Sequence, residues 1–453
     1  MSAAVEVLPL GEVVKPTRPR VKPTDYPDLP FIGMEHIEAH SMKLLGTVPA
    51  SAMKSSAVHF KSGDVLYGRL RPYLNKVYRP SFEGLCSAEF IVLPETERLD
   101  GKYLQYFLNS GAFVRFASHL NAGDRPRVDF DQIAAHDIPL PHVDVQRSVV
   151  AEIEKQFSRL DEAVANLRRV KAHLKRYKAA ILKAAVEGRL VESEAEIARR
   201  EGRSYETGAQ LLQRILKTRR ILWKSKGKYK EPAAPDTTDL PELPEGWVWA
   251  TVEQISGLVE YGSSSKTNED STGIPVLRMG NIVEGELVFG ELKYLPARHD
   301  EFPKLLLEPG DLLFNRTNSP ELVGKTAVFR GSPRKCSFAS YLIRIRLVEG
   351  GATGFLAAYI SSSHGRNWLK SVVTQQVGQA NVNGTKLQAL VVPLPPELEQ
   401  ARIVGEIDRR LSLIRETASQ VDANRLRAER LRQSILVKAF SGAFGLGNSD
   451  AST

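Results

Sequence analysis

Residues 139–190 are PLPHVDVQRSVVAEIEKQFSRLDEAVANLRRVKAHLKRYKAAILKAAVEGRL, and the pattern returns at residues 393–444 as PLPPELEQARIVGEIDRRLSLIRETASQVDANRLRAERLRQSILVKAFSGAF. The two stretches align without a gap at an offset of 254 residues, with identities such as Gln146/Gln400, Glu152/Glu406 and Ile181/Ile435. Upstream, GDVLYGR at Gly63–Arg69 resembles GDLLFNR at Gly310–Arg316, at an offset of 247 residues. The chain is therefore predicted to be a tandem duplication of a globular unit followed by a long helix.

Each repeated stretch predicts one helix of about 35 residues, well above the average length. Its apolar residues recur every three or four positions and form a narrow stripe, which is typical of a coiled coil. The candidate seam and partner-facing positions are Ile153, Leu160, Leu167, Leu174, Ile181, Ile407, Ile414, Asn424 and Ile435. Asn424 fits a polar residue that fixes the register of a coiled coil, but a lone asparagine could equally mark a solvated edge. The alternative is that each amphipathic helix packs only on its own globular unit.

The composition excludes several classes of protein. The chain has 453 residues, of which 42% are hydrophobic and 25% charged, as in ordinary globular proteins of two to four domains. Two cysteines exclude a disulfide framework and a Cys-rich zinc site. There is no apolar run of the ~18 residues that a membrane span needs, and the N-terminus lacks a secretory signal pattern, so we expect a cytoplasmic protein.

The net charge of +9 suggests a polyanionic partner, but its distribution is uneven. Residues 146–230 hold 22 basic and 10 acidic side chains, whereas both globular units are slightly acidic. Non-specific attraction to DNA is therefore expected from the middle of the chain.

No catalytic or cofactor motif is convincing. The segment SPELVGKT at Ser319–Thr326 resembles a phosphate-binding loop, but its first position is Ser and Pro320 removes an amide donor. No G-x-G-x-x-G loop follows a predicted strand, and the nine histidines form no metal-ligand spacing. We expect a chain without catalytic residues, metal or cofactor of its own.

The globular units mix short β-rich runs with short helices and Gly/Pro turns, which predicts an α+β fold. Two guanidiniums occupy the turn Gly123–Arg127, while amides fill the matching segment Gln379–Asn383. Because Arg pairs with guanine and Asn or Gln with adenine, the exchange fits readers of two different half-sites. The candidate DNA contacts are Arg69, Arg71, Asn75, Lys76, Arg125, Arg127, Ser264, Lys266, Arg278, Asn281, Asn315, Arg316, Asn318, Gln379, Asn381 and Asn383.

Four segments in this order resemble one known family. They are LPEGWVW at Leu243–Trp249, the two PLP segments that lead to Gln146 and Gln400, and SYETGAQLL at Ser204–Leu212 followed by KYKEP. Over essentially its whole length the chain resembles the specificity (S) subunit of type I restriction–modification enzymes. The first globular unit departs from the family pattern because it lacks an L-P-x-G-W opening.

The resemblance implies two target-recognition domains separated by two long antiparallel coiled-coil helices, with pseudo-two-fold symmetry. A helix pair of about 35 residues would span ~50 Å, or about 15 base pairs, and would set the spacing of a bipartite double-stranded DNA site. The resemblance also implies that two methyltransferase (M) subunits and restriction (R) subunits join the chain. These partners would carry S-adenosylmethionine, ATP and Mg²⁺. The remaining alternative is a duplicated coiled-coil scaffold for proteins, without DNA readout.

The expected boundaries follow from the duplication and the resemblance. They are recognition domain 1 at 1–145, spacer helix 1 at 146–190, a central helical segment and acidic linker at 191–240, recognition domain 2 at 241–395, spacer helix 2 at 396–445, and a tail at 446–453.

Overall fold

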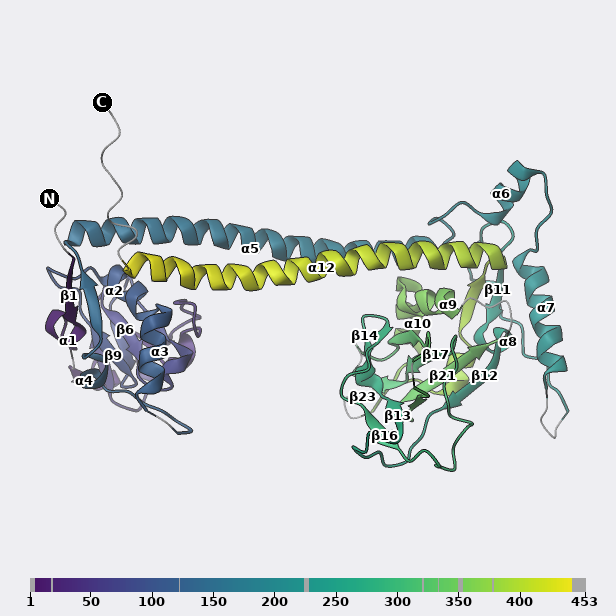
Figure 1. Ribbon diagram of the computed structural model, residues 1–453, viewed down its shortest axis with the longest axis horizontal. Helices are drawn as coiled ribbons and strands as arrows, with labels where there is room; N and C mark the ends of the chain where they lie inside the picture. Colours follow the sequence, from purple (N-terminus) through teal and green to yellow (C-terminus); the bar gives the residue numbers. More distant parts are fainter. Residues whose placement is uncertain are drawn as a thin grey trace. The chain divides into compact units, whose positions relative to one another are not determined.

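The computed structural model describes residues 5–441, with gaps at 18, 122, 224–227, 320–321, 333, 349–352 and 377–378, and gives only the backbone of 318, 374–376 and 379–380. The expected tail at 446–453 lies outside the described residues. The chain forms two compact units (Figure 1): unit 1 contains the residues up to Val170 and those from Gln420 on, and unit 2 contains Lys171–Ser419. Both units mix helices and strands, which confirms the predicted α+β class.

Unit 1 is built from short strands in three sheets, with orders β2-β5-β8-β3-β4, β7-β6-β9 and β1-β10. Strands β6 and β9 are buried along their whole length, as their apolar sequences require. The strands are β1 (Glu6–Pro9), β2 (Arg20–Val21), β3 (Pro30–Ile32), β4 (Val48–Pro49), β5 (Ala57–Phe60), β6 (Val65–Gly68), β7 (Val77–Tyr78), β8 (Gly84–Ser87), β9 (Phe90–Leu93) and β10 (Asp137–Leu140).

The helices of unit 1 pack on the sheet β7-β6-β9, where Tyr67, Tyr103 and Phe113 are almost fully buried. Asp100 and Ser110 cap α2 and α3 by accepting from the amides three residues further on. The helices and 3₁₀ turns are α1 (Leu10–Val13), η1 (Pro23–Asp25), η2 (Met34–His36), η3 (Ala50–Ala52), η4 (Pro72–Leu74), α2 (Gly101–Leu108), α3 (Gly111–His119) and α4 (Phe130–Ile133), with parts of α5 (Val143–Val186) and α12 (Glu397–Phe440).

Unit 2 has a central sheet of order β12-β21-β17-β19, with smaller sheets β16-β13-β20, β18-β23-β22, β14-β15 and β11-β24. Its strands are β11 (Val248–Thr251), β12 (Ser256–Tyr261), β13 (Ile274–Leu277), β14 (Ile282–Val283), β15 (Glu286–Leu287), β16 (Lys293–Leu295), β17 (Leu312–Asn315), β18 (Thr317–Asn318), β19 (Thr326–Val328), β20 (Ser337–Phe338), β21 (Leu342–Leu347), β22 (Thr374–Gln376), β23 (Gln379–Asn381) and β24 (Val391–Leu394).

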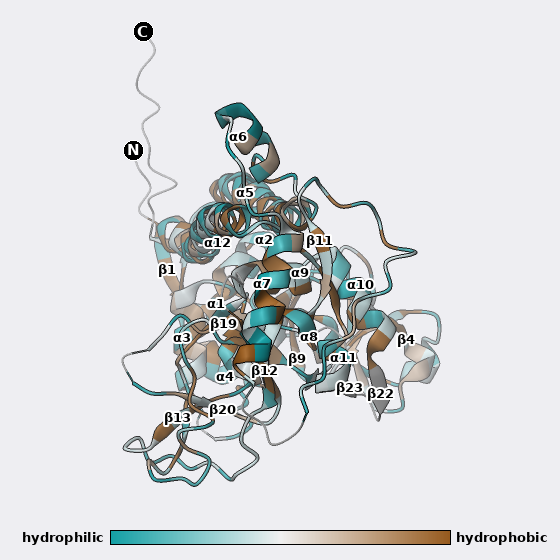
Figure 2. Cartoon of the chain, turned by 90° about the vertical axis from the view of Figure 1, so that its right-hand side faces the viewer, coloured by the Kyte–Doolittle hydropathy of each residue, from teal (hydrophilic) through white to brown (hydrophobic). Residues whose placement is uncertain are grey.

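The helices of unit 2 include the two from the central segment, α6 and α7. In Figure 2, α7 has both hydrophobic and hydrophilic turns, and Leu211 and Ile215 are its fully buried residues. Gly208 begins α7 so close to the carbonyl of Leu394 that a Cβ would lie 2.2 Å from it. The elements are α6 (Glu194–Glu201), α7 (Gly208–Ile221), α8 (Val252–Ile255), η5 (Met279–Asn281), α9 (Thr353–Ser361), α10 (Ser363–Val372) and α11 (Gly384–Gln388).

The two long helices pair within each unit. In unit 1 the first half of α5 shares a core with the last turns of α12, through Ile153 and Ile435. In unit 2 the last turns of α5 share a core with the first half of α12, through Ile181 and Ile407. The helices therefore run antiparallel, which confirms the predicted fold class.

The seam predicted for α12 needs one correction. Asn424 is exposed, and the buried positions are Val421 and Ala428 with half-buried Arg425 between them. The pattern of apolar residues does not reveal this shift, because the aliphatic part of an arginine can cover a helix seam as well as a leucine does. Leu160, Leu167 and Leu174 on α5 are half-buried.

Both repeats of the PLP segment use the same glutamine contact. The Gln146 side chain donates to the carbonyls of Pro141 and Arg98 at 2.8 and 2.7 Å. The buried Gln400 donates to the carbonyl of Pro395 at 2.7 Å. Each glutamine thus ties the first turn of a long helix to the chain that enters it, and this contact explains why the residue recurs.

The L-P-x-G-W opening of unit 2 is held by a buried carboxylate. Trp247 donates from Nε1 to Glu399 Oε1 at 3.0 Å, and the amide of Glu194 donates to Glu399 Oε2 at 2.9 Å. Burial raises the pKa of Glu399. The motif, the central segment and α12 therefore meet at one residue. Among the described residues there is no helix that could cross a membrane.

Candidate nucleic-acid interface

In unit 1 the two loops that carry the predicted arginines lie side by side. Arg69 follows β6; its amide donates to the carbonyl of Glu89 at 2.9 Å, and its carbonyl accepts from the amide of Val128 at 3.0 Å. Two residues further on, the Arg71 amide donates to the carbonyl of Pro126 at 2.7 Å. These backbone bonds place the aromatic and basic loop after β6 against the Gly/Pro turn.

Two arginines on this surface form ion pairs with carboxylates. Arg127 lies 2.5 Å from Glu89 Oε1, and Arg69 forms an ion pair with Asp129. The carboxylates hold two guanidinium groups in fixed orientations on neighbouring segments. Two further arginines of this surface are exposed: Arg71 and Arg125.

Two other predicted contacts of unit 1 have side chains that are bonded within the unit. Asn75 is 2% exposed and donates to the side-chain oxygen of Asn109. Lys76 is half-buried and donates from Nζ to the carbonyl of Met34 at 2.6 Å. Both side chains are engaged in holding the turn η4 and its surroundings.

Unit 2 repeats the backbone arrangement with other side chains. The Arg316 amide donates to the carbonyl of Tyr341 at 3.0 Å, and the carbonyl of Arg316 accepts from the amide of Val382 at 2.9 Å. The strands β18 and β23 continue this contact, with Thr317 opposite Asn381. Asn381 is exposed at the place that corresponds to Arg127.

Arg316 has an aromatic partner instead of a carboxylate. Its guanidinium lies 5.0 Å from the centre of the Tyr261 ring, and the Tyr261 hydroxyl accepts from the amide of Gly384 at 2.7 Å. The ring fixes the guanidinium through a cation–π contact and leaves its charge uncompensated by that partner. This arrangement favours an anionic or electron-rich ligand.

Three predicted asparagines of unit 2 have framework contacts. Asn315 is buried and donates to the carbonyl of Leu322 at 3.2 Å. Asn281 is 6% exposed and donates to two carbonyls, at 2.8 and 3.1 Å. Asn383 is exposed but caps α11, accepting from the amide of Lys386 at 2.8 Å.

The remaining candidates differ in exposure. Ser264 and Lys266 are exposed in the loop after β12, next to a bridge between Ser263 and Ala339. Arg278 is half-buried and donates to the carbonyl of Glu291 at 3.0 Å. The side chains of two others lie outside the described part of the structure: Asn318 and Gln379.

The hydrogen bonds define four matched positions in the two units. Each pair lies at the same place in the backbone frame, yet three of the four pairs differ in chemical type. The pairs are Arg69 with Arg316, Glu89 with Tyr341, Arg127 with Asn381, and Asp129 with Asn383.

Sequence reasoning did not single out Glu89, Asp129, Tyr261 or Tyr341. A usable signal existed for Asp129, because it lies 254 residues before Asn383 and both precede a short helix as N-caps. Glu89 and Tyr341 lie before buried strands in loops of different sequence, so only the fold shows that they correspond.

The described residues contain no group of three or more His, Cys, Asp or Glu side chains that could hold a metal ion. Both cysteines are buried, and desolvation raises the pKa of the Cys86 and Cys336 thiols, which disfavours the reactive thiolate. A cavity of 120 Å³ beside Arg69 is lined by Arg20 and Asp129 and is too small for a cofactor.

Comparison with known proteins agrees with this architecture. The model of the type I restriction modification DNA specificity domain matches residues 244–419. The EcoKI specificity subunit of Escherichia coli K12 is 26% identical over 368 residues, which cover 80% of this chain and 68% of the relative.

Two solved structures share the fold. One comes from a study of complex assembly and conformational transition of the type I R-M system, with a TM-score of 0.70, 20% identity, and coverage of 97% of this chain and 98% of that one. The other is the HsdS subunit from Thermoanaerobacter tengcongensis, with a TM-score of 0.57, 22% identity and 98% coverage of both chains. Residues 244–419 of this chain therefore match the DNA specificity domain of type I restriction–modification enzymes, and the whole chain resembles their specificity subunits in sequence and shares their fold.

Proposed function

We propose that this chain is the DNA-recognition subunit of a type I restriction–modification complex and that each globular unit reads one half of a bipartite site. The pair of matched frames carries the proposal: one backbone arrangement presents arginines with carboxylates in unit 1, and an amide with aromatic groups in unit 2. Two globular units with the same backbone arrangement but different side chains can recognise two different short DNA sequences.

In unit 1 the proposed readers are Arg125 and Arg127. Arg127 is held by Glu89, so its guanidinium loses little conformational freedom when it binds a base. A guanidinium fork suits the O6 and N7 atoms of guanine in the major groove. Arg71 is exposed beside them and suits a phosphate contact.

In unit 2 the proposed reader is Asn381, whose amide can both donate to and accept from adenine. Arg316 is oriented by Tyr261 and suits a guanine or phosphate contact nearby. The exposed residues Ser264 and Lys266 complete the proposed surface. The buried asparagines 281 and 315 act as framework for it.

The long helices are the proposed spacer. Recognition domains at 1–145 and 241–395 would be joined by spacer helices at 146–190 and 396–445, with the central segment at 191–240. Because the two halves of the chain are pseudo-equivalent, the helices offer two similar docking surfaces, which suits two copies of a methyltransferase subunit. Restriction subunits would join this assembly.

The proposed subunit performs no chemistry itself. S-adenosylmethionine, ATP and Mg²⁺ would be bound by the methyltransferase and restriction subunits, and the complex would act on DNA in the cytoplasm. The charge of the middle of the chain would contribute non-specific attraction to DNA.

Methylome sequencing tests the proposal. Host cells would carry cognate methyltransferase subunits with this chain, or with none. We expect a bipartite methylated motif that requires the chain. A motif unchanged by removing the chain would contradict the proposal.

A second experiment separates the DNA reader from a protein scaffold. Inserting one helical turn, about four residues, into both α5 and α12 is expected to change the length of the spacer and to leave both half-site sequences as they are. An unchanged spacer would show that the length of the helix pair does not set the distance between the half-sites. Equal binding of the assembled complex to all DNA sequences would favour the scaffold.

A further inference from the structure

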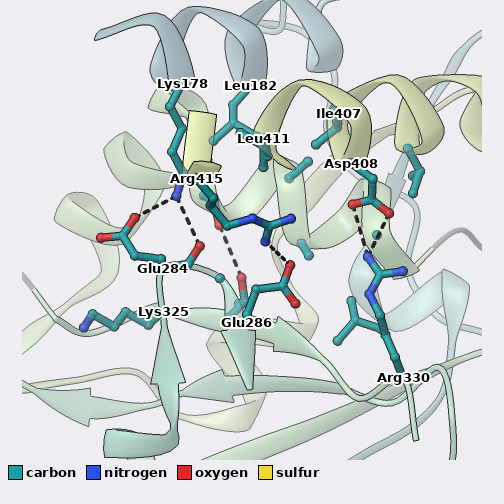
Figure 3. A pocket seen from close by; sticks show the side chains of 18 of the residues that line it. Lys178, Leu182, Glu284, Glu286, Lys325, Arg330, Ile407, Asp408, Leu411 and Arg415 are labelled. Carbon is teal, nitrogen blue, oxygen red and sulfur yellow. Dashed lines mark hydrogen bonds and ion pairs between the residues drawn. The ribbon is translucent and has the colours of Figure 1, made fainter. Parts of the chain in front are cut away.

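Unit 2 contains a hairpin that contacts both long helices (Figure 3). Glu284 and Gly285 join β14 to β15, and both have positive φ, +54° and +91°, as in a tight two-residue turn. Lys178 on α5 donates from Nζ to Glu284 Oε2 at 3.0 Å. Arg415 on α12 donates to Glu286 Oε1 at 2.5 Å. One acidic hairpin therefore binds a cation from each helix.

A third ion pair attaches the same unit to α12. Arg330, which follows β19, donates from Nη2 to the two carboxylate oxygens of Asp408 at 3.1 and 2.9 Å. A cavity of about 270 Å³ lies among these ion pairs and is also lined by Leu411 (Figure 3). Polar walls and this volume allow several water molecules. The contact between unit 2 and the helices is therefore partly ionic and accessible to water.

Unit 1 lacks this arrangement at the equivalent helix positions. The residues that correspond to Lys178 and Arg415 at the repeat offset of 254 are Arg432 and Asp161. These two side chains form an ion pair with each other. At these two positions the helix charges of unit 1 pair with each other, whereas the equivalent charges of unit 2 pair with the hairpin. Elsewhere on α5 in unit 1, Glu154 pairs with Lys102 of α2.

The apolar side of the contact differs in the same way. Phe157 of α5 is 6% exposed, lies 5.7 Å from the ring of Tyr106, and carries the Arg432 guanidinium 4.6 Å above its ring. Its equivalent in unit 2 is the smaller Leu411, which lines the cavity. An aromatic ring fills the space in unit 1, and ion pairs around a cavity replace it in unit 2.

We propose that the β14–β15 hairpin, through Glu284 and Glu286, fixes the orientation of the second recognition domain on the helix pair and so determines the register of its half-site. The inference rests on the proposed function for its DNA consequence, and on the ion pairs alone for its structural part. Ion pairs around a water-accessible cavity are weakened by salt. We therefore expect the orientation of this domain on the helix pair to depend on the salt concentration.

Hydrogen–deuterium exchange of the full-length chain tests the structural part. The variant E284Q/E286Q would be compared with E242Q/E291Q, which removes the same charge from exposed carboxylates that form no ion pair within the described residues. At about 0.05 M salt we expect amides of residues 282–287 to exchange about threefold to tenfold faster in E284Q/E286Q than in wild type. At about 0.5 M salt the difference should shrink, because wild type also loosens. If E284Q/E286Q exchanges these amides at the same rate as wild type at both salt concentrations, the inference is overturned.

The methylated motif tests the DNA consequence in the assembled complex. With E284Q/E286Q we expect both half-site sequences to persist while the spacer becomes less strict by a base pair. A strict spacer, or a changed second half-site sequence, would overturn the inference. If wild type itself directs no bipartite methylation, the proposed function fails, while the exchange measurement still decides whether the hairpin fixes the domain.

Discussion

Asp64 in unit 1 and Asp311 in unit 2 occupy the same turn before β6 and β17, but their surroundings differ. Each carboxylate accepts from the backbone amide three residues earlier at 2.8 Å. Only Asp311 also binds arginine: Arg346 lies 2.7 Å away, and the fully buried Arg344 lies 3.5 Å away. In unit 1 the position of Arg344 is taken by Val92. The turn thus needs one acceptor, and the arginines are an addition of unit 2.

The added arginines have a separate task. Arg344 donates to the carbonyls of Lys304 and Leu306 at 2.9 and 2.6 Å and so holds the loop before Asp311. Unit 1 has no equivalent pair on β9, whose residues are apolar and buried. The same backbone frame therefore tolerates an ionic core in one copy and an apolar one in the other, which frees its side chains to diverge.

Replacing the aspartates sharpens this comparison and should give the largest effect. Asp311→Asn removes a buried carboxylate beside two arginines, although Arg344 keeps its ion pair with Glu260 and Arg346 keeps its ion pair with Glu308. The variant is expected to cost about 1–3 kcal/mol of local stability. Asp64→Asn keeps the acceptor oxygen and should change stability by less than about 1 kcal/mol. Hydrogen exchange of amides in β17 and β6 under native conditions measures both values. Equal losses would show that the arginines add nothing.

The pH dependence of the Asp64 variant has a definite sign. Burial raises the pKa of Asp64, partly offset by the hydrogen bond from the Lys61 amide. Compared with the unfolded state, the folded state therefore binds a proton at Asp64 more tightly. The stability that this proton contributes is present below the pKa of Asp64 in the unfolded state and is lost as pH rises through its pKa in the folded state. The stability of Asp64→Asn relative to wild type should increase from low pH to neutral pH. A decrease over that range would contradict the assignment of burial as the main cause.

The two readers can be separated by substitution at their matched positions. The double variant R125A/R127A should lose about 1–3 kcal/mol of discrimination for each base contact at one half-site and leave the other unchanged. Asn381→Ala should weaken discrimination at the other half-site and leave the first one unchanged. Competition binding of the assembled complex to DNA libraries randomised in one half-site at a time measures both effects. Loss at both half-sites from either variant would mean that the units do not read independently.

Much of this architecture could be predicted from the repeat alone. The offset of 254 residues predicted two long helices, and the recurring glutamines and PLP segments mark how each helix is entered. The exchange of Arg127 for Asn381 was visible because the segments around them align. These features follow from local sequence pattern, which does not depend on contacts between distant residues.

The roles of the asparagines could not be predicted in this way. Asn75 and Asn281 stand in polar, turn-rich stretches that resemble exposed loops, yet both are buried and bonded to groups outside their own turns. A buried amide is tolerated where it satisfies polar partners, and those partners emerge only from the tertiary fold. Glu89 was missed for the same reason, since its ion pair with Arg127 joins residues 38 positions apart.

The smallest effect concerns the two ways in which the helices hold the units. Leu411→Phe would place the ring of unit 1 in the cavity of unit 2, which has room for the added atoms. Because burial of further apolar surface is opposed by lost water contacts with the charged walls, we expect a gain below about 1 kcal/mol. The informative result is the salt dependence: exchange of residues 282–287 should respond less to salt than in wild type, since packing replaces part of the ionic contact. The reciprocal Phe157→Leu should make unit 1 more salt-sensitive. If both variants keep the wild-type salt response, the cavity and the ring do not account for the difference in salt sensitivity between the two units. The ion pairs of the hairpin alone would then account for that difference.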